Sequence, residues 1–194
     1  MALLISGMFC PLCDQPMTAG QPLFGTWGVW LPSGDPLWRF CDAGIHWPCY
    51  AAWPERRRFA RSYFEFWIAH EPQDPFWHRV YLDEHVYAEV NPEPLVASLW
   101  VVLAETGSRI SVKLSDWDAW LHRTDDGHHD VETATLLVAK CALSAAIPSA
   151  TAVTGAIDVE RKRALYERIR AERADAKRRN REKQAADRAR KGQK

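Results

Sequence analysis

The sequence predicts an α+β protein with three parts: an N-terminal module of a hairpin plus a helix, a small α+β domain, and a C-terminal charged helix. Four of the five cysteines lie in the first 50 residues, among glycines and prolines. The middle of the chain mixes strand-like and helical patterns, and the end is rich in Ala, Arg, Lys and Glu. We place the three parts at residues 1–71, 76–150 and 157–194. With 47% hydrophobic residues and ten tryptophans, most of the chain is expected to fold.

In the first part, paired aromatics surround a turn signal at residues 32–35, which predicts two short strands joined there. A helix should follow Pro54, because proline suits a first helical turn and the aromatic residues that follow recur at helical spacing. Pro72 and Pro75 should end this helix and form a short linker.

The middle part has strand-like stretches from Trp77, with a hairpin predicted around residues 105–108. Ser115, with Asp118 three residues later, indicates a capped short helix. Residues 131–147 are apolar on most faces, so we expect a buried helix in which Cys141 acts as a small hydrophobic residue.

The last part has oppositely charged residues four positions apart, a spacing that favours helix. Its larger apolar residues stop at Ile169, so the first three turns are expected to dock on the body and the rest, from about Ala171, to project. Up to Ile157 the chain has 10 basic and 18 acidic residues, and after it 15 basic and 7 acidic. A basic tail on an acidic body indicates that the tail contacts an anionic partner or surface, and the alternative is a solvated helix.

Cys10 and Cys13 form a C-x-x-C pair, and His46 with Cys49 forms an H-x-x-C pair. Zinc takes four tetrahedral nitrogen or sulfur ligands, so two such pairs can complete one site. Cys41 is a rival to His46 as the fourth ligand. A site closed by four protein ligands organises structure and leaves no position at which to activate water. The expected cofactor is therefore one structural Zn²⁺.

In ligand type and spacing, this arrangement resembles a treble-clef zinc finger of the single LIM-type half, C-x2-C followed by H-x2-C, as in small uncharacterised bacterial proteins. The resemblance covers about residues 8–70. It implies a knuckle, a hairpin and ligands on a first helical turn. The 32 residues between Cys13 and His46 exceed the usual LIM interval and no second half follows, so only the fold idea is carried over.

The sequence has no G-x-S-x-G, P-loop or G-x-G-x-x-G pattern, and no histidine between Cys13 and His46 such as a treble-clef nuclease would use on its hairpin. We therefore expect no catalytic or cofactor-binding residues. The leading hypothesis is a non-enzymatic interaction protein with a protein partner, an adaptor or complex subunit, one version being a bacterial immunity or defence role. An enzyme is a further alternative.

The other hypothesis is a nucleic-acid-binding regulator. It would use the basic tail together with four arginines on the predicted helix of the N-terminal module, which suit phosphate contacts but also suit a solvated helical face. They are Arg56, Arg57, Arg58 and Arg61. Neither a signal peptide nor a membrane span is evident, so we expect a cytoplasmic protein without membrane contact.

Overall fold

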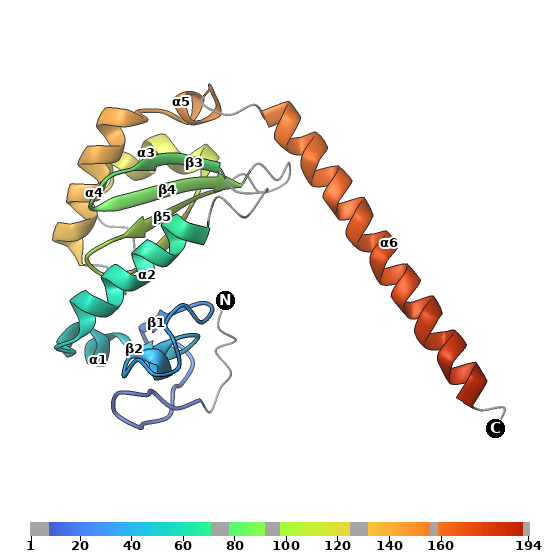
Figure 1. The fold of residues 1–194 in the computed structure, drawn as a ribbon. Coiled ribbons are helices and arrows are strands. Elements are labelled where there is room, and N and C mark those ends of the chain that lie inside the picture. Colours follow the sequence, from blue (N-terminus) through green and yellow to red (C-terminus); the bar gives the residue numbers. More distant parts are fainter. Residues whose placement is uncertain (1–7, 71–77, 92–97, 125–131, 156–158, 192–194) are drawn as a thin grey trace.

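The computed structural model describes residues 8–70, 78–91, 98–124, 132–155 and 159–191, and it confirms the α+β class. The described part contains two antiparallel sheets, several short helices and one long C-terminal helix (Figure 1). In chain order the elements are β1 (Leu23–Gly25), η1 (Trp38–Phe40), β2 (Gly44–His46), α1 (Trp47–Ala52), α2 (Arg56–His70), β3 (His78–Leu82), β4 (Val86–Asn91), β5 (Ser98–Leu103), β6 (Arg109–Lys113), η3 (Leu114–Asp116), α3 (Trp117–His122), α4 (Thr133–Ala146), α5 (Ala150–Gly155) and α6 (Val159–Lys191).

Strands β3 to β6 form a four-stranded antiparallel sheet in sequence order, and the predicted hairpin is the β5–β6 connection. Alternate residues point to opposite faces of a strand, so the sheet presents two different apolar surfaces. One surface, with Val101 at its centre, packs against α3, α4 and α5. The other carries Tyr87 and Val102 and packs against α2 and the N-terminal module. The sheet is therefore covered on both faces.

The first hairpin differs from the prediction. A turn does form at residues 32–35, with the Asp35 amide donating to Pro32 over 2.8 Å, but the segment after it becomes the 3-10 helix η1. Asp35 also accepts a bond from the Leu37 amide, which favours a tight turn over an extended strand. Strand β1 pairs instead with β2, directly before α1. The strands of this hairpin are thus separated by a long loop.

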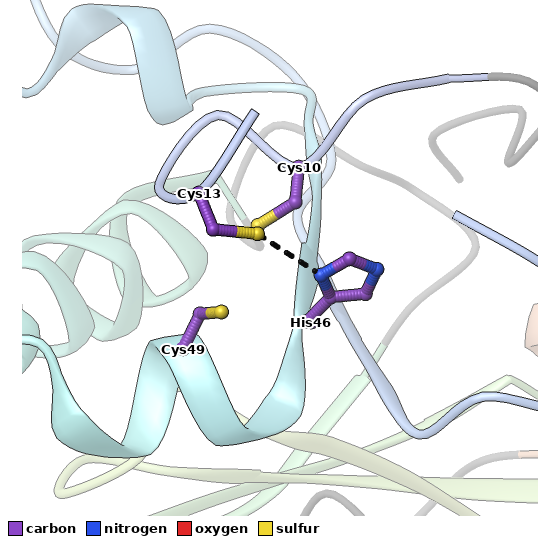
Figure 2. A group of neighbouring side chains, drawn as sticks. All are labelled: Cys10, Cys13, His46 and Cys49. Carbon is purple, nitrogen blue, oxygen red and sulfur yellow. Dashed lines mark hydrogen bonds between the residues drawn. The ribbon is translucent and has the colours of Figure 1, made fainter. Parts of the chain in front are cut away.

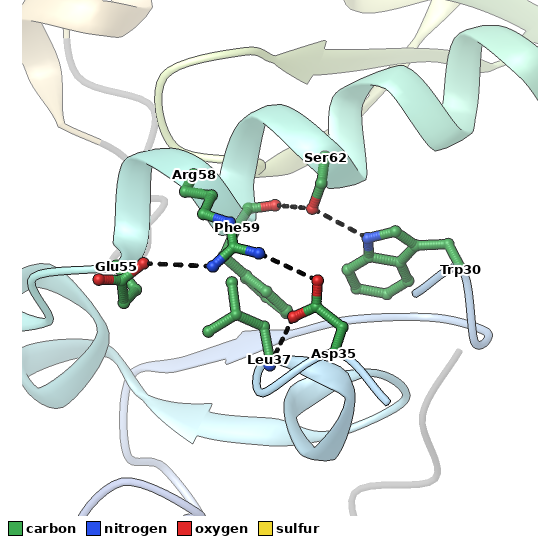
Figure 3. Close-up of polar contacts among 7 residues, drawn as sticks. All are labelled: Trp30, Asp35, Leu37, Glu55, Arg58, Phe59 and Ser62. Atoms are coloured by element: carbon green, nitrogen blue, oxygen red, sulfur yellow. Dashed lines mark hydrogen bonds and ion pairs between the residues drawn. The ribbon is translucent and has the colours of Figure 1, made fainter. Parts of the chain in front are cut away.

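This loop is fixed to α2, as Figure 3 shows. The indole of Trp30 donates to Ser62, whose hydroxyl donates to the carbonyl of Phe59. Arg58 lies 3.0 Å from the carboxylate of Asp35. Helix α2, which the aromatic spacing predicted, is therefore the element against which the rest of the N-terminal module packs.

The β5–β6 turn reaches into the same aromatic core. The hydroxyl of Tyr50, on α1, donates to the carbonyl of Thr106 over 2.7 Å, and the Tyr50 ring stacks on Phe24 with centroids 3.8 Å apart. A Cβ atom placed on Gly107 would lie 3.3 Å from both Ala60 and Phe24. The N-terminal module and the large sheet therefore share one core.

Helix α4 is only partly buried, unlike the expectation of a buried helix. Its inner face includes Lys140, whose ammonium donates to the carbonyl of Arg123 and lies 4.6 Å from the ring centre of Trp120. Leu137 and Val138 are exposed, and so is Cys141, although the sequence predicts a buried position for it. Ser115 does not cap α3, since its hydroxyl donates to the neighbouring Asp116 and no side chain caps the helix.

Helix α6 begins close to α5 and projects away from the rest of the described chain (Figure 1). Among the residues that the structure describes, the first three turns are not seen to dock along the body as expected. From Ala171 nearly every described side chain is exposed, as expected. Among the described residues, no helix is long and apolar enough to cross a membrane.

Candidate metal centre

Four side chains from two distant segments meet in the N-terminal module (Figure 2). The ligand atoms of Cys10, Cys13, His46 and Cys49 all lie within 4.8 Å of one another, so the group is suited to hold one metal ion. Cys13 Sγ and His46 Nδ1 are 3.4 Å apart. The structure thus brings together the two pairs that the spacing singled out.

The first pair lies on a tight loop closed by backbone hydrogen bonds. The Cys10 amide donates to the carbonyl of Gln15, and the Asp14 amide donates back to Cys10, both over 2.9 Å. Asp14 closes the loop in the left-handed region with φ 54°, a conformation that aspartate tolerates better than most residues. This geometry turns both thiols of the C-x-x-C sequence toward the same point.

The second pair is positioned by the junction of β2 and α1. His46 ends β2 and is the N-cap residue of α1, and Pro48 fits the first helical turn, where no amide donor is needed. Cys49 then lies on that first turn. The pairing of β1 with β2 holds His46 opposite Leu23, so the hairpin fixes where the helix begins.

The thiols of the cluster have unequal acidities. Burial acts to raise the pKa of Cys10, but hydrogen bonds from the backbone amides of His46, Leu12 and Cys13 outweigh it, and the pKa is lowered. Burial, and then the neighbouring sulfurs of Cys13 and Cys10, raise the pKa of Cys49 to about 11. Several sulfurs this close cannot all be anionic without a cation between them. The donor set therefore suits a bound metal ion.

His46 presents one of its ring nitrogens to the cysteines. Its Nδ1 faces the cysteines, whereas its Nε2 is buried and has no hydrogen-bond partner within the described part of the chain. A buried ring nitrogen without a partner is costly. A metal ion bound at Nδ1 would leave Nε2 as the N–H donor of the ring.

The rival ligand, Cys41, does not belong to this group. Cys41 directly follows η1, and its amide donates to the carbonyl of Trp38 at the start of η1. The backbone is extended there, and β2 begins only at Gly44. The fourth member of the cluster, beside Cys10, Cys13 and Cys49, is therefore His46.

The four arginines of the nucleic-acid hypothesis each lie near an acidic side chain. Arg56 is 2.5 Å from Glu132, and Arg58 is 3.0 Å from Asp35. Arg57 and Arg61 approach Glu105 and Glu65, at 3.9 and 2.9 Å. The first three pairs connect α2 to other segments, whereas Arg61 and Glu65 both lie on α2. Arg56 is largely buried beside its partner, whereas the side chains of Arg57, Arg58 and Arg61 are 85%, 58% and 50% exposed.

A buried charge cluster at the α2 face of the sheet was not predicted from the sequence. Arg109 lies between the rings of Trp67 and Trp100, 4.1 and 3.7 Å from their centres, and 3.2 Å from the buried carboxylate of Glu89. Tyr87 also donates to Glu89. The sequence did contain one signal for this cluster, since Glu89 interrupts a mostly apolar strand segment and a buried carboxylate requires a partner.

Comparison of the chain with protein-family models, with curated proteins and with solved structures finds no match. The case for a function therefore rests on the chemistry of the described residues.

Proposed function

We propose that this chain is a non-enzymatic interaction protein whose N-terminal module is a treble clef stabilised by one structural zinc ion. The protein would act as an adaptor or complex subunit, one version being a bacterial immunity role. Cys10, Cys13, His46 and Cys49 carry the proposal, because three sulfurs and one imidazole suit zinc. Zinc bonds of ~2.0 to 2.3 Å set tetrahedral ligands roughly 3.5 to 3.8 Å apart, close to the 3.4 Å between Cys13 and His46.

A structural role follows from the number of ligands. Four protein ligands fill the tetrahedral shell, so no position is left for a water or a substrate. The ion would stabilise the module outright, since metal binding to such sites supplies about 10 kcal/mol or more. Thiolate ligands also favour a reducing compartment, which is why we place the protein in the cytoplasm.

Protein contact is supported by large apolar side chains on the surface of the same module. Phe9 is 62% exposed, Val29 58% and Trp38 42%. Exposed aromatic residues are enriched at the centres of protein interfaces. The zinc ion would then hold rigid the loops that present these side chains to a partner.

Two measurements test the metal. Elemental analysis should find one zinc per chain in the wild type and in Cys41→Ser, and much less in His46→Ala. If Cys41→Ser loses the metal and His46→Ala keeps it, the assignment of the fourth ligand is wrong. If no variant or wild-type sample contains zinc, the proposed stabilisation fails.

The interaction is tested by capture of the tagged full chain from its native cell. Trp38→Ala should lose the captured partner. The matched control is Leu137→Ala on α4, because Leu137 is also 42% exposed but lies outside the module. Retention of the partner by Trp38→Ala, or its equal loss from both variants, would contradict a contact through the module. A turnover that depends on the cluster would contradict the non-enzymatic role.

A further inference from the structure

Helix α6 presents positive charge along one side. Arg170, Arg173, Lys177 and Arg181 follow one another at intervals of three and four residues and are all exposed. At about 100° per residue they fall within an arc of about 80° and span roughly 16 Å along the helix. We call these four residues the basic face of α6.

Along the span of this face the acidic residues lie to its side, whereas Glu167, before Arg170, and Asp187, after Arg181, lie about 40° from its edges. Glu172, Asp175 and Glu182 lie about 100° or more around the helix from it. Two of them are near arginines outside the basic face: Glu172 is 3.9 Å from Arg168, and Asp175 is 3.2 Å from Arg178. Between Arg170 and Arg181 the basic face therefore contains no acidic residue, although basic residues also lie on the other sides of the helix.

The chemistry of α6 narrows the kind of partner. From Ala171 to Lys191 the only apolar residues are alanines. A helix that binds a protein groove needs larger apolar anchors at helical spacing, and a helix that lies on a membrane needs a face with Trp, Phe or Leu. Neither is available here. The basic face offers only charge and arginine forks, which match the oxygens of phosphate groups.

We infer that the basic face of α6 binds the phosphodiester backbone of a nucleic acid without reading its sequence. The projection of α6 from the body leaves this face accessible (Figure 1). A helix with its side chains is about 10 to 12 Å wide, comparable with the major groove of duplex DNA. This inference goes beyond the proposed function and does not depend on it, since no metal ligand lies on α6.

Two variants of the full chain, each lacking four positive charges of α6, test the inference. The first removes the basic face: Arg170→Gln, Arg173→Gln, Lys177→Gln and Arg181→Gln. The matched control changes four basic residues elsewhere on the helix: Arg168→Gln, Arg178→Gln, Arg179→Gln and Lys183→Gln. Glutamine has nearly the helix propensity of the residues replaced, and circular dichroism checks that helix content is kept.

Binding to a 20-base-pair DNA duplex and to an RNA duplex of the same sequence is measured by fluorescence anisotropy at several salt concentrations. Four phosphate contacts predict that log affinity falls with log salt with a slope of about −3.6, a loss of roughly 150-fold between 50 and 200 mM. The first variant should lose nearly all of this slope, whereas the control should keep it to within about one unit. Binding of either duplex in this way supports the inference, and the two arms show which nucleic acid is preferred.

Equal weakening of both variants would overturn the inference, because the face would then be irrelevant. So would absence of wild-type binding to both duplexes. Polyglutamate and vesicles with anionic lipid are added as competitors at equal charge concentration. If either competes as well as unlabelled duplex, the face recognises anionic surfaces in general and the inference is wrong.

Discussion

Replacing Gly107 with alanine should destabilise the whole body of the protein. Gly107 has φ +68°, a conformation that costs an alanine about 1 to 2 kcal/mol. The added methyl would also lie 3.3 Å from the backbone of Ala60 and from the ring of Phe24, closer than ordinary contact, so these neighbours must move. A crowded core adds about 1 kcal/mol or more, which gives about 2 to 3 kcal/mol in total.

Gly20→Ala is the control for the backbone part of this cost. Gly20 also has a positive φ, 84°, but a methyl there would meet nothing within 4 Å. Urea unfolding of the metal-loaded protein should therefore show a loss of about 1 to 2 kcal/mol for Gly20→Ala and a larger loss for Gly107→Ala. Equal losses would refute the packing of the β5–β6 turn against the N-terminal module.

Three further predictions concern charged groups. Asp83→Asn should cost about 1 to 2 kcal/mol in urea unfolding. Burial raises the pKa of Asp83, but donors from Val86, His85 and Tyr81 outweigh it and the pKa is lowered. The stabilisation from Asp83 is therefore present at pH values above the usual pKa of aspartate and is lost as the pH falls below it. In Asp83→Asn the free energy of unfolding should depend less on pH in this acid range. An unchanged pH dependence would contradict the hydrogen bonds assigned to Asp83. Glu89→Ala leaves Arg109 beside two rings without its carboxylate partner and should lower the free energy of unfolding by about 3 kcal/mol. Arg57→Ala removes an exposed pair and should lower it by about 0.5 kcal/mol or less. Similar losses in both variants would contradict a stabilising buried pair between Glu89 and Arg109. Zinc binding should release protons, because the pKa of the Cys49 thiol is raised to about 11. Each proton released weakens zinc affinity about tenfold for every unit by which the pH falls. Calorimetry in two buffers measures the number of protons released, and a value of zero would contradict ligation by thiolates.

Local signals predicted much of this fold. The C-x-x-C and H-x-x-C spacings predicted two local pairs of donors, because each pair lies on one short loop or turn. The aromatic spacing predicted α2, and the turn at residues 105–108 predicted the β5–β6 hairpin. In these cases the residues that decide the structure are neighbours in the sequence.

The remaining features depend on partners that are distant in the sequence. The pairing of β1 with β2 skips the turn at residues 32–35, where the Asp35 side chain favours η1. A helix that is apolar on most faces does not specify which side is buried, so Lys140 reaches Trp120 while Cys141 faces solvent. Glu132 and Glu105, which lie near Arg56 and Arg57, are far along the chain, so the local sequence did not predict these two ion pairs.

The bond from Tyr50 to Thr106 also bears on how the chain is made. The two residues are 56 positions apart, so the N-terminal module leaves the ribosome well before the turn that completes its core. During that interval the rings of Phe24 and Tyr50 have no turn to cover them. A metal ion bound early would hold the ligand loops together while synthesis continues, and the sheet would then close on a module that is already formed.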